Sequence, residues 1–257
     1  MIDLHTHLLP DWDDGAQDWV EMYKMAKIAL KDGITKIVLT PHIFRLTKHG
    51  DNTELLEAMF VLFKEKASRF EIEFYRGAEV FIHPEIIENV RKYRLTIEGS
   101  DYVFVEFPAD HVVTTVRDLF YKMMLEGLIP IISHPERNAV FAARPELLFD
   151  LINMGALAQV TAKSILGDFG GETSDVAKKF LENNLVHVIA SDAHNSEKRP
   201  PLLNEAVERA AKIVGKEKAQ AMVNSIPQAI LENKEIPDYG SPANPSPKKR
   251  WIIRFRK

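Results

Sequence analysis

Histidines and acidic residues recur along this chain at positions that could bind metal ions. Singly, each is more often a satisfied core or loop residue, but together they form a set of nine: His5, His7, Asp14, His42, Glu79, Glu106, His134, Asp192 and His194. Imidazole and carboxylate ligands without sulfur suit Mn²⁺, iron or Zn²⁺ in a hydrolytic centre. Nine ligands are too many for one ion, so the set predicts two or three metal ions.

The chain of 257 residues contains no cysteine, and this excludes several kinds of site. Without thiols there is no disulfide framework, no thiolate zinc site, no iron–sulfur cluster and no cysteine nucleophile. The sequence also lacks an apolar stretch of the length that spans a bilayer, and its first residues do not resemble a signal peptide. We therefore expect a cytoplasmic protein.

The elements that must position these residues alternate between short β-rich runs and longer amphipathic runs, a pattern that predicts parallel βαβ units. Seven strands are expected, at Met1–Leu4, Ile34–Thr40, Ile72–Val80, Tyr102–Phe107, Ile129–Ser133, Leu157–Thr161 and Val186–Ala190. Helices are expected at Trp19–Lys31, Thr53–Arg69, Val116–Glu126, Glu146–Met154, Ser174–Asn183, Leu202–Val214, Lys216–Asn224 and Pro227–Glu232.

The candidate ligands follow the carboxyl ends of six of these seven strands, where ligands collect in parallel α/β folds. Only the sixth strand, Leu157–Thr161, has no histidine or carboxylate at its tip. Glu79 and Glu106 lie among apolar residues, so each is expected to be paired or metal-bound. Seven strands without an intervening linker favour a closed or nearly closed α/β barrel, with an open doubly wound sheet as the alternative.

The charge of the chain is unevenly distributed. Residues 241–257 carry six cations and no anion, so the other 240 residues carry a net charge of −10, against −4 for the whole chain. An acidic body argues against nucleic-acid binding. The Pro-rich and then basic tail, 233–257, is expected to be a flexible extension that could contact an acidic partner or an anionic membrane surface.

Six motifs follow one another along the chain: MIDLHTHLLPDWDDG, TPHI, GAEV, VEF, SHPERN and VIASDAHN. In this order they resemble the PHP (polymerase and histidinol phosphatase) superfamily. Within that superfamily, the DDG loop, HPERN and the SDAHN segment with its following RPP resemble the CpsB/CapC/YwqE-type bacterial tyrosine phosphatases. The resemblance covers residues 1–232, which would form one PHP catalytic domain.

The resemblance implies a distorted (β/α)7 barrel that binds three divalent cations at the carboxyl ends of its strands. The cations are commonly manganese, with iron or zinc as alternatives. The implied ligand sets are His5, His7, Glu79 and Asp192 for one ion, Glu79, Glu106 and His134 for a second, and Asp14, His42 and His194 for a third. Arg137 in HPERN and Arg199 before Pro200-Pro201 match the family's phosphate-binding arginines.

The implied function is a phosphotyrosine-protein phosphatase that acts on a bacterial tyrosine autokinase in capsule or exopolysaccharide synthesis. Hydroxide bridging two ions would attack phosphorus while Arg137 and Arg199 hold the phosphoryl oxygens. Two alternatives remain: a PHP-type small-molecule phosphoesterase such as a histidinol phosphatase, and a metal-stabilised adaptor without enzymatic activity. The loops expected at 43–52 and 162–172 would set the width of the opening and so the size of the substrate.

Overall fold

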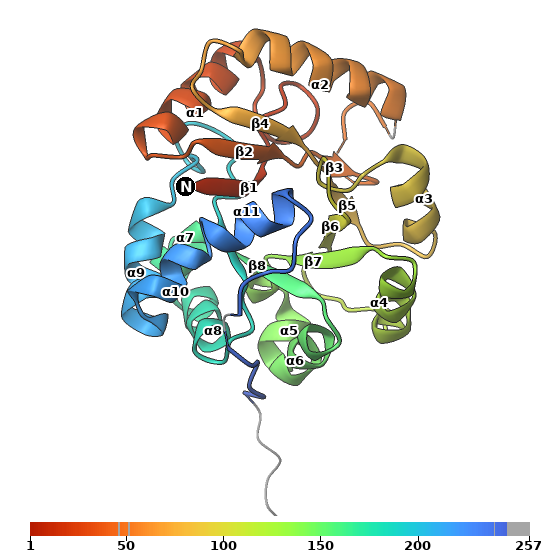
Figure 1. Ribbon diagram of the computed structural model, residues 1–257, viewed down its shortest axis with the longest axis vertical. Helices are drawn as coiled ribbons and strands as arrows, with labels where there is room; N and C mark the ends of the chain where they lie inside the picture. The colour runs from red at the N-terminus through yellow and green to blue at the C-terminus, as the bar shows by residue number, and fades with distance from the viewer. Residues whose placement is uncertain (46, 51, 239, 246–257) are drawn as a thin grey trace, which may run out of the picture.

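Parallel strands alternate with helices in the computed structural model, which describes residues 1–45, 47–50, 52–238 and 240–245 (Figure 1). The strands are β1 (Ile2–Thr6), β2 (Lys36–Leu39), β3 (His42–Ile43), β4 (Glu73–Arg76), β5 (Glu79–Phe81), β6 (Tyr102–Glu106), β7 (Ile129–Ser133), β8 (Leu157–Thr161) and β9 (Val188–Ala190). The longer helices are α1 (Trp19–Lys31), α2 (Thr53–Ala67), α3 (Ile86–Tyr93), α4 (Val116–Leu125), α6 (Pro145–Asn153), α8 (Gly171–Glu182) and α9 (Asn204–Val214). Shorter helices are η1 (Pro135–Arg137), α5 (Ala139–Ala143), α7 (Ala162–Leu166), α10 (Lys216–Ala221) and α11 (Ser225–Leu231).

The strands form two parallel sheets, of order β1-β2-β4 and β3-β5-β6-β7-β8-β9. The second expected strand, Ile34–Thr40, corresponds to β2 alone, and the short strand β3 that follows Thr40-Pro41 was not predicted. The third expected strand, Ile72–Val80, is split in two at Gly77-Ala78, between β4 and β5. A Cβ on Gly77 would lie 2.7 Å from Cγ1 of Val38, so the chain at this break passes directly against β2.

The two sheets are joined at both of their junctions. Strand β2 leads into β3 and β4 into β5, while at the other end Thr6 of β1 pairs in parallel with Ala193, just after β9. The predicted parallel α/β fold is confirmed, and these two junctions are the connections that a distorted barrel requires.

Apolar side chains pack on both faces of the strands. The larger cluster lies between the strands and the surrounding helices and includes Met22 and Met25 of α1 together with Phe120 of α4. In the smaller cluster, Leu4 and Phe104 from the strands meet Ile226 of α11. Helix α11 lies across the strands in Figure 1 and covers their inner face, because its apolar side contacts the residues that point away from the outer helices.

Three helices and a 3₁₀ turn were not among the predicted elements: α3, α5, α7 and η1. Helices α5 and α7 have five residues each, which is too short for a 3.6-residue period to show in the sequence. The prediction of a loop at 162–172 is therefore wrong. It consists of α7, a short connection at 167–170 and the first residues of α8.

The segment after residue 232 returns to the body of the protein. The backbone N–H of Ala243 donates to the carbonyl of Asn183, and the side chain of Asn184 donates to the carbonyl of Ser241. The basic residues 248–257 of the predicted tail lie outside the described part of the chain. Among the described residues, no helix combines the length and the apolar character needed to cross a membrane.

Candidate metal centre

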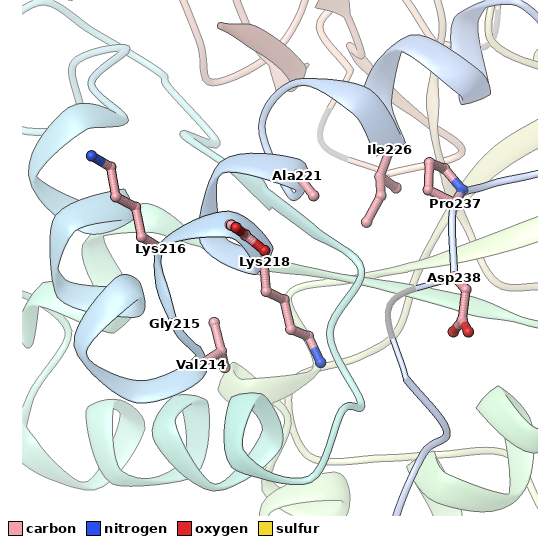
Figure 2. A pocket seen from close by; sticks show the side chains of 9 residues that line it. Val214, Gly215, Lys216, Lys218, Ala221, Ile226, Pro237 and Asp238 are labelled. Carbon is pink, nitrogen blue, oxygen red and sulfur yellow. The ribbon is translucent and has the colours of Figure 1, made fainter.

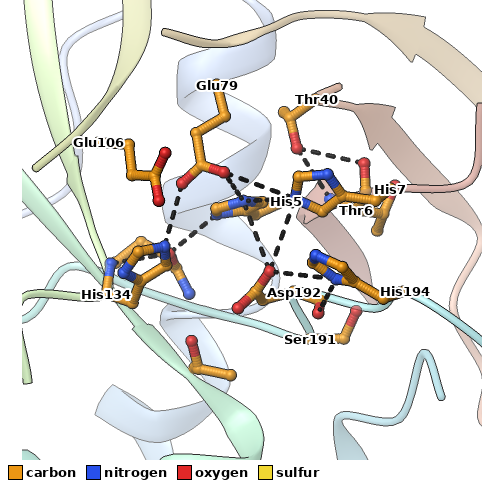
Figure 3. Close-up of polar contacts among 12 residues, drawn as sticks. His5, Thr6, His7, Thr40, Glu79, Glu106, His134, Ser191, Asp192 and His194 are labelled. Atoms are coloured by element: carbon orange, nitrogen blue, oxygen red, sulfur yellow. Dashed lines mark hydrogen bonds and ion pairs between the residues drawn. The ribbon is translucent and has the colours of Figure 1, made fainter. Parts of the chain in front are cut away.

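The fold brings all nine candidate ligands to one end of the strands, and Figure 3 shows seven of them, all except Asp14 and His42. His5 lies in β1 and His7 just after it, while Asp14 follows in the next loop. His42, Glu79 and Glu106 lie in β3, β5 and β6, His134 follows β7, and Asp192 and His194 follow β9. Eight of the nine are buried or nearly so, and Asp14 has a side chain that is 50% exposed. The centre is therefore open to solvent on the side of Asp14.

Glu79 lies at the middle of this cluster and is fully buried. Its Oε2 lies 3.3 Å from Nε2 of His5 and 3.1 Å from Nδ1 of His42. Its Oε1 lies 3.1 Å from Nε2 of His134. One carboxylate thus faces imidazoles that come from three different strands.

The donor set fits divalent cations. Neither oxygen of Glu79, nor Oε2 of Glu106, nor Nδ1 of His42 has a hydrogen-bond partner among the described residues. A buried carboxylate in this state is costly unless a positive charge compensates it. Burial by itself would raise the pKa of Glu79, but the neighbouring histidines, above all His5 and His42, hold that pKa well below its ordinary value.

The carboxylates around His42 likewise favour a positive charge on its imidazole ring. Burial opposes its protonation, yet Glu79, Asp14 and Glu106 together raise the pKa of His42 to about 11. His194 has the opposite shift, since burial and the nearby His7 lower its pKa to about 4. Cations bound here would replace the proton on His42, so binding should release protons.

Two residues that the sequence analysis missed orient the histidines from behind. Oε1 of Gln159, in β8, lies 3.0 Å from Nδ1 of His5, and Oδ2 of Asp13 lies 2.8 Å from Nδ1 of His7. Each contact leaves Nε2 of the imidazole as the atom that faces Glu79 and Asp192, as second partners of metal-bound histidines commonly do. The sixth predicted strand therefore contributes to the centre through an amide, a residue type that the search for histidines and carboxylates did not include.

The loop after β1 holds Asp13 and Asp14 in place through close backbone contacts. Oδ1 of Asp13 accepts a hydrogen bond from the backbone N–H of Gly15 at 2.9 Å. A Cβ on Gly15 would lie 2.2 Å from the carbonyl oxygen of His7, so only glycine fits there. The indole N–H of Trp12 donates to the carbonyl of His42 at 3.1 Å and ties this loop to β3.

Two candidate ligands adopt backbone conformations that are uncommon for their residue types. His134 has a φ of 32° and Asp192 a φ of 52°. Non-glycine residues in this region cost free energy and occur often at functional sites. In both cases the turn comes directly at the end of a strand and directs the side chain toward the cluster.

The two candidate phosphate-binding arginines meet at Asp192. Nη1 of Arg137 and Nη2 of Arg199 each lie 2.6 Å from Oδ2 of Asp192, while Oδ1 lies 3.6 Å from Nε2 of His7. One carboxylate oxygen thus faces the arginines and the other the imidazoles. A third arginine, Arg45, was not among the predicted site residues. It donates to Oε1 of Glu106 at 3.1 Å.

Three groups of ligand atoms lie close enough together to hold an ion. They are His7, Asp14, His42 and His194; His5, His7 and Asp192; and His42, Glu79 and Glu106. Within each group the ligand atoms lie within 4.8 Å of one another. These groups overlap with the three predicted sets, but His7 and His42 each belong to two of them. The assignment of individual residues to individual ions therefore stays a prediction.

Two cavities differ in their relation to this centre. A small one of about 100 Å³ is lined by His134, Glu106, Arg45 and Arg137, so it opens beside the metal ligands. A larger one of about 670 Å³ lies by α10 and α11 and is lined by Lys216, Lys218, Ile226 and Asp238 (Figure 2). None of the nine candidate ligands lines the larger cavity, so we assign the chemistry to the smaller one despite its size.

Comparison with known proteins places the chain in a family. A family model described as "Capsular polysaccharide synthesis, CpsB/CapC" matches residues 1–232. The chain is 35% identical over 238 residues to the tyrosine-protein phosphatase YwqE of Bacillus subtilis, and the alignment covers 92% of this chain and 91% of YwqE.

Two solved structures share the fold. One comes from work on YwqE of Bacillus subtilis and CpsB of Streptococcus pneumoniae, described as unique metal-dependent tyrosine phosphatases. It has a TM-score of 0.85 at 32% identity, and the match covers 95% of this chain and 99% of that chain. The other is the histidinol phosphate phosphatase of Lactococcus lactis in complex with zinc, L-histidinol and phosphate. It has a TM-score of 0.54 at 12% identity and covers 84% of this chain and 93% of its own. At 12% identity, the second likeness concerns the fold alone.

Proposed function

The chain belongs to the CpsB/CapC family, and from this premise we propose that it is a metal-dependent phosphotyrosine-protein phosphatase. It is an enzyme of the phosphoric monoester hydrolase class, as its named relatives are. The observation that carries the proposal is the convergence of nine candidate metal ligands, with Glu79 among them at the centre, and of Arg137 and Arg199, both held on Asp192.

The nine buried and half-buried ligands would hold divalent cations, for which we propose three ions of manganese. Bound there, such cations supply a water molecule of lowered pKa as the nucleophile and positive charge for the phosphoryl oxygens. The protein orients the donors: Gln159 and Asp13 fix the rings of His5 and His7, and Glu79 offers both of its oxygens to the cluster.

The substrate's phosphoryl group would be bound by Arg137 and Arg199. Their side chains are partly exposed, at 31% and 22%, so each can reach a ligand while it stays anchored on Asp192. Forked, charge-assisted hydrogen bonds from arginine suit phosphoryl oxygens. The phenol of tyrosine has a pKa of about 10, so its phenolate leaves without a dedicated general acid.

The physiological substrate we propose is a phosphotyrosine-bearing bacterial tyrosine kinase in the cytoplasm, within capsule or exopolysaccharide synthesis. A protein substrate agrees with the partial exposure of Asp14 and with the small volume of the cavity beside His134 and Arg137. The basic residues of the tail would contact an acidic partner or a membrane surface. Deletion of 241–257 separates this role from catalysis, because turnover of a small aryl phosphate should survive the deletion.

Substrate comparison tests the proposal against its alternatives. Turnover of a phosphotyrosine peptide is measured beside that of histidinol phosphate in manganese buffer, each with and without a chelator. We expect the peptide to be preferred, the chelator to abolish turnover and a thiol alkylator to leave it unchanged, because the chain has no cysteine. Preference for histidinol phosphate would support a small-molecule phosphoesterase. Tight peptide binding without turnover would support the adaptor, and turnover that survives exhaustive chelation would contradict the metal mechanism.

A further inference from the structure

One aromatic ring lies against both arginines of the centre. The guanidinium carbon of Arg137 lies 4.9 Å from the ring centroid of Phe169, and that of Arg199 lies 5.9 Å from the same centroid. Both distances are within the range of a cation–π interaction. The two arginines are 62 positions apart in the sequence, and they reach this ring from η1 and from the loop after β9.

Two glycines with positive φ angles shape the loop that carries Phe169. Phe169 lies in the connection 167–170 between α7 and α8, and the flanking Gly167 and Gly170 have φ angles of 95° and 97°. Residues with a Cβ rarely adopt such angles, so the two glycines allow the tight turn on either side of the ring. Phe169 is half-buried, so part of its surface is exposed.

A lysine ties this loop to the one that carries Arg199. Nζ of Lys163 lies 2.6 Å from Oδ2 of Asp168 and donates to the carbonyl of Lys198 at 2.8 Å. Asp168 precedes Phe169, and Lys198 precedes Arg199. The ring and the guanidinium group are therefore held next to each other by their backbone neighbours as well as by direct contact.

Asp192 alone does not determine the orientation of the two arginines. Each guanidinium group donates through one nitrogen to the same oxygen, Oδ2. The carboxylate therefore fixes one nitrogen of each guanidinium group, and each group can still rotate about that hydrogen bond. Two like charges on a single oxygen also repel each other. A ring in contact with both groups limits this rotation and stabilises both positive charges.

We propose that Phe169 is a positioning residue that holds the guanidinium groups of Arg137 and Arg199 in place for the phosphoryl group. The proposal rests on the phosphatase function argued above, because that function assigns phosphate binding to the two arginines. Among the described residues, the ring of Phe169 contacts the guanidinium groups of the two arginines and no ring contact joins it to a candidate metal ligand. Its loss should therefore weaken phosphate binding and leave metal content unchanged.

Calorimetric titration of the manganese-loaded protein with inorganic phosphate tests this role without relying on turnover. Phe169→Leu keeps an apolar side chain but removes the ring, and we expect phosphate affinity to fall by about fivefold to tenfold. Phe169→Tyr keeps the ring and should bind phosphate as the unmodified protein does. Phe149→Leu, a half-buried phenylalanine on α6, is the matched control and should not change phosphate affinity.

Kinetics on an aryl phosphate provide the second measurement. Phe169→Leu should raise KM by a factor similar to the loss of phosphate affinity, with a smaller change in kcat, and Phe169→Tyr should restore KM. Lys163→Met removes the tie between the two loops and should raise KM in the same direction without touching the ring. Because the side chain of Lys163 is partly exposed, at 22%, this variant also tests the arrangement should Phe169→Leu fail to fold.

Three outcomes would overturn the role of Phe169: unchanged phosphate affinity in Phe169→Leu, an equal loss in Phe149→Leu, or loss of manganese from Phe169→Leu. Failure of the phosphatase function looks different. In that case the unmodified protein would bind phosphate more tightly than Phe169→Leu but would turn over no phosphotyrosine substrate.

Discussion

Oδ2 of Asp13 lies 2.8 Å from Nδ1 of His7 and at the same time accepts a hydrogen bond from the backbone N–H of His42 at 2.9 Å. One buried carboxylate oxygen thus orients an imidazole from β1 and the main chain of β3. Asp13 neighbours the predicted ligand Asp14 but faces the other way, behind the histidines. It acts on the metal centre through the residues that it holds.

Replacement of Asp13 by Asn should weaken metal binding without abolishing the fold. Loss of a carboxylate behind a metal-bound histidine typically costs 10-fold to 100-fold in metal affinity, and we expect about that for manganese, measured by competition with a fluorescent chelator. Asp11→Asn is the control, since Asp11 lies in the same loop at a φ of 57° that asparagine tolerates and pairs with the exposed Lys48. Equal affinities in the two variants would show that Asp13 has no such role.

Glu79→Gln should have a larger effect, because Glu79 faces imidazoles from three strands. We expect turnover to fall by more than about a hundredfold. Residues that only orient a metal ligand typically change metal affinity or activity by about 10-fold to 100-fold. Manganese per chain should fall together with turnover. Elemental analysis and thermal unfolding separate metal loss from unfolding, with Glu65→Gln on the exposed face of α2 as the control. Full metal content together with full activity would contradict the central position of Glu79.

Arg137→Ala should separate phosphate binding from metal binding. Hydrogen bonds to charged groups contribute about 1.5–3 kcal/mol, so we expect KM and the inhibition constant of inorganic phosphate to rise by about 10-fold to 100-fold. Metal content should be unchanged, because Arg137 contacts Oδ2 of Asp192 and not the oxygen that faces the histidines. A fall in metal content would instead assign Arg137 a structural role in holding Asp192.

His187 directly precedes β9, at the end of that strand opposite to the metal centre. We expect this residue to make the protein less stable in mild acid. Burial, and to a lesser degree the positive charge of Lys218, lowers the pKa of this 2% exposed histidine to about 3. Its Nδ1 accepts a hydrogen bond from the backbone N–H of Ala158, which requires the neutral ring. The unfolded chain, with an ordinary histidine pKa of about 6.5, binds the proton first, so the free energy of unfolding falls as pH drops from 6.5 toward 3.

Urea unfolding at pH 6.5 and pH 5 measures this contribution. The share of His187 amounts to about 1.5–2 kcal/mol over that interval. A His187→Gln variant should lose less stability than the unmodified protein over the same interval, by about that amount. His49→Gln, which changes a half-exposed histidine, should keep the full pH dependence. The same pH dependence in all three proteins would exclude His187 as its source.

Much of the centre could be predicted from sequence because its ligands follow a regular rule. In a parallel α/β fold, residues at the carboxyl ends of strands meet at one edge whatever their spacing in the chain. Glu79 and Glu106 were conspicuous because acidic residues rarely occur in buried strands without a partner. The predicted strands were correct in position, although the third is broken into β4 and β5 and the short strand β3 was not predicted.

Residues that act through neutral or aromatic groups gave no such signal. Gln159 contacts His5 across 154 positions, and Phe169 reaches arginines in two other loops. An amide in a strand or a phenylalanine between glycines is ordinary in sequence, and its partner is decided only by the order of the strands and the path of the loops. Short helices such as α7 were missed for a related reason, because five residues do not establish a period.

The sequence by itself determined the chemistry: oxygen and nitrogen ligands without a thiol, placed at strand ends in an acidic body. This follows from residue types and local periodicity, which need no knowledge of distant contacts. The tertiary structure decided how these groups share their roles, with Glu79 between three strands and Asp192 divided between imidazoles and arginines. Such divisions depend on which oxygen faces which partner, and only the packing of strands and loops from the whole chain sets that geometry.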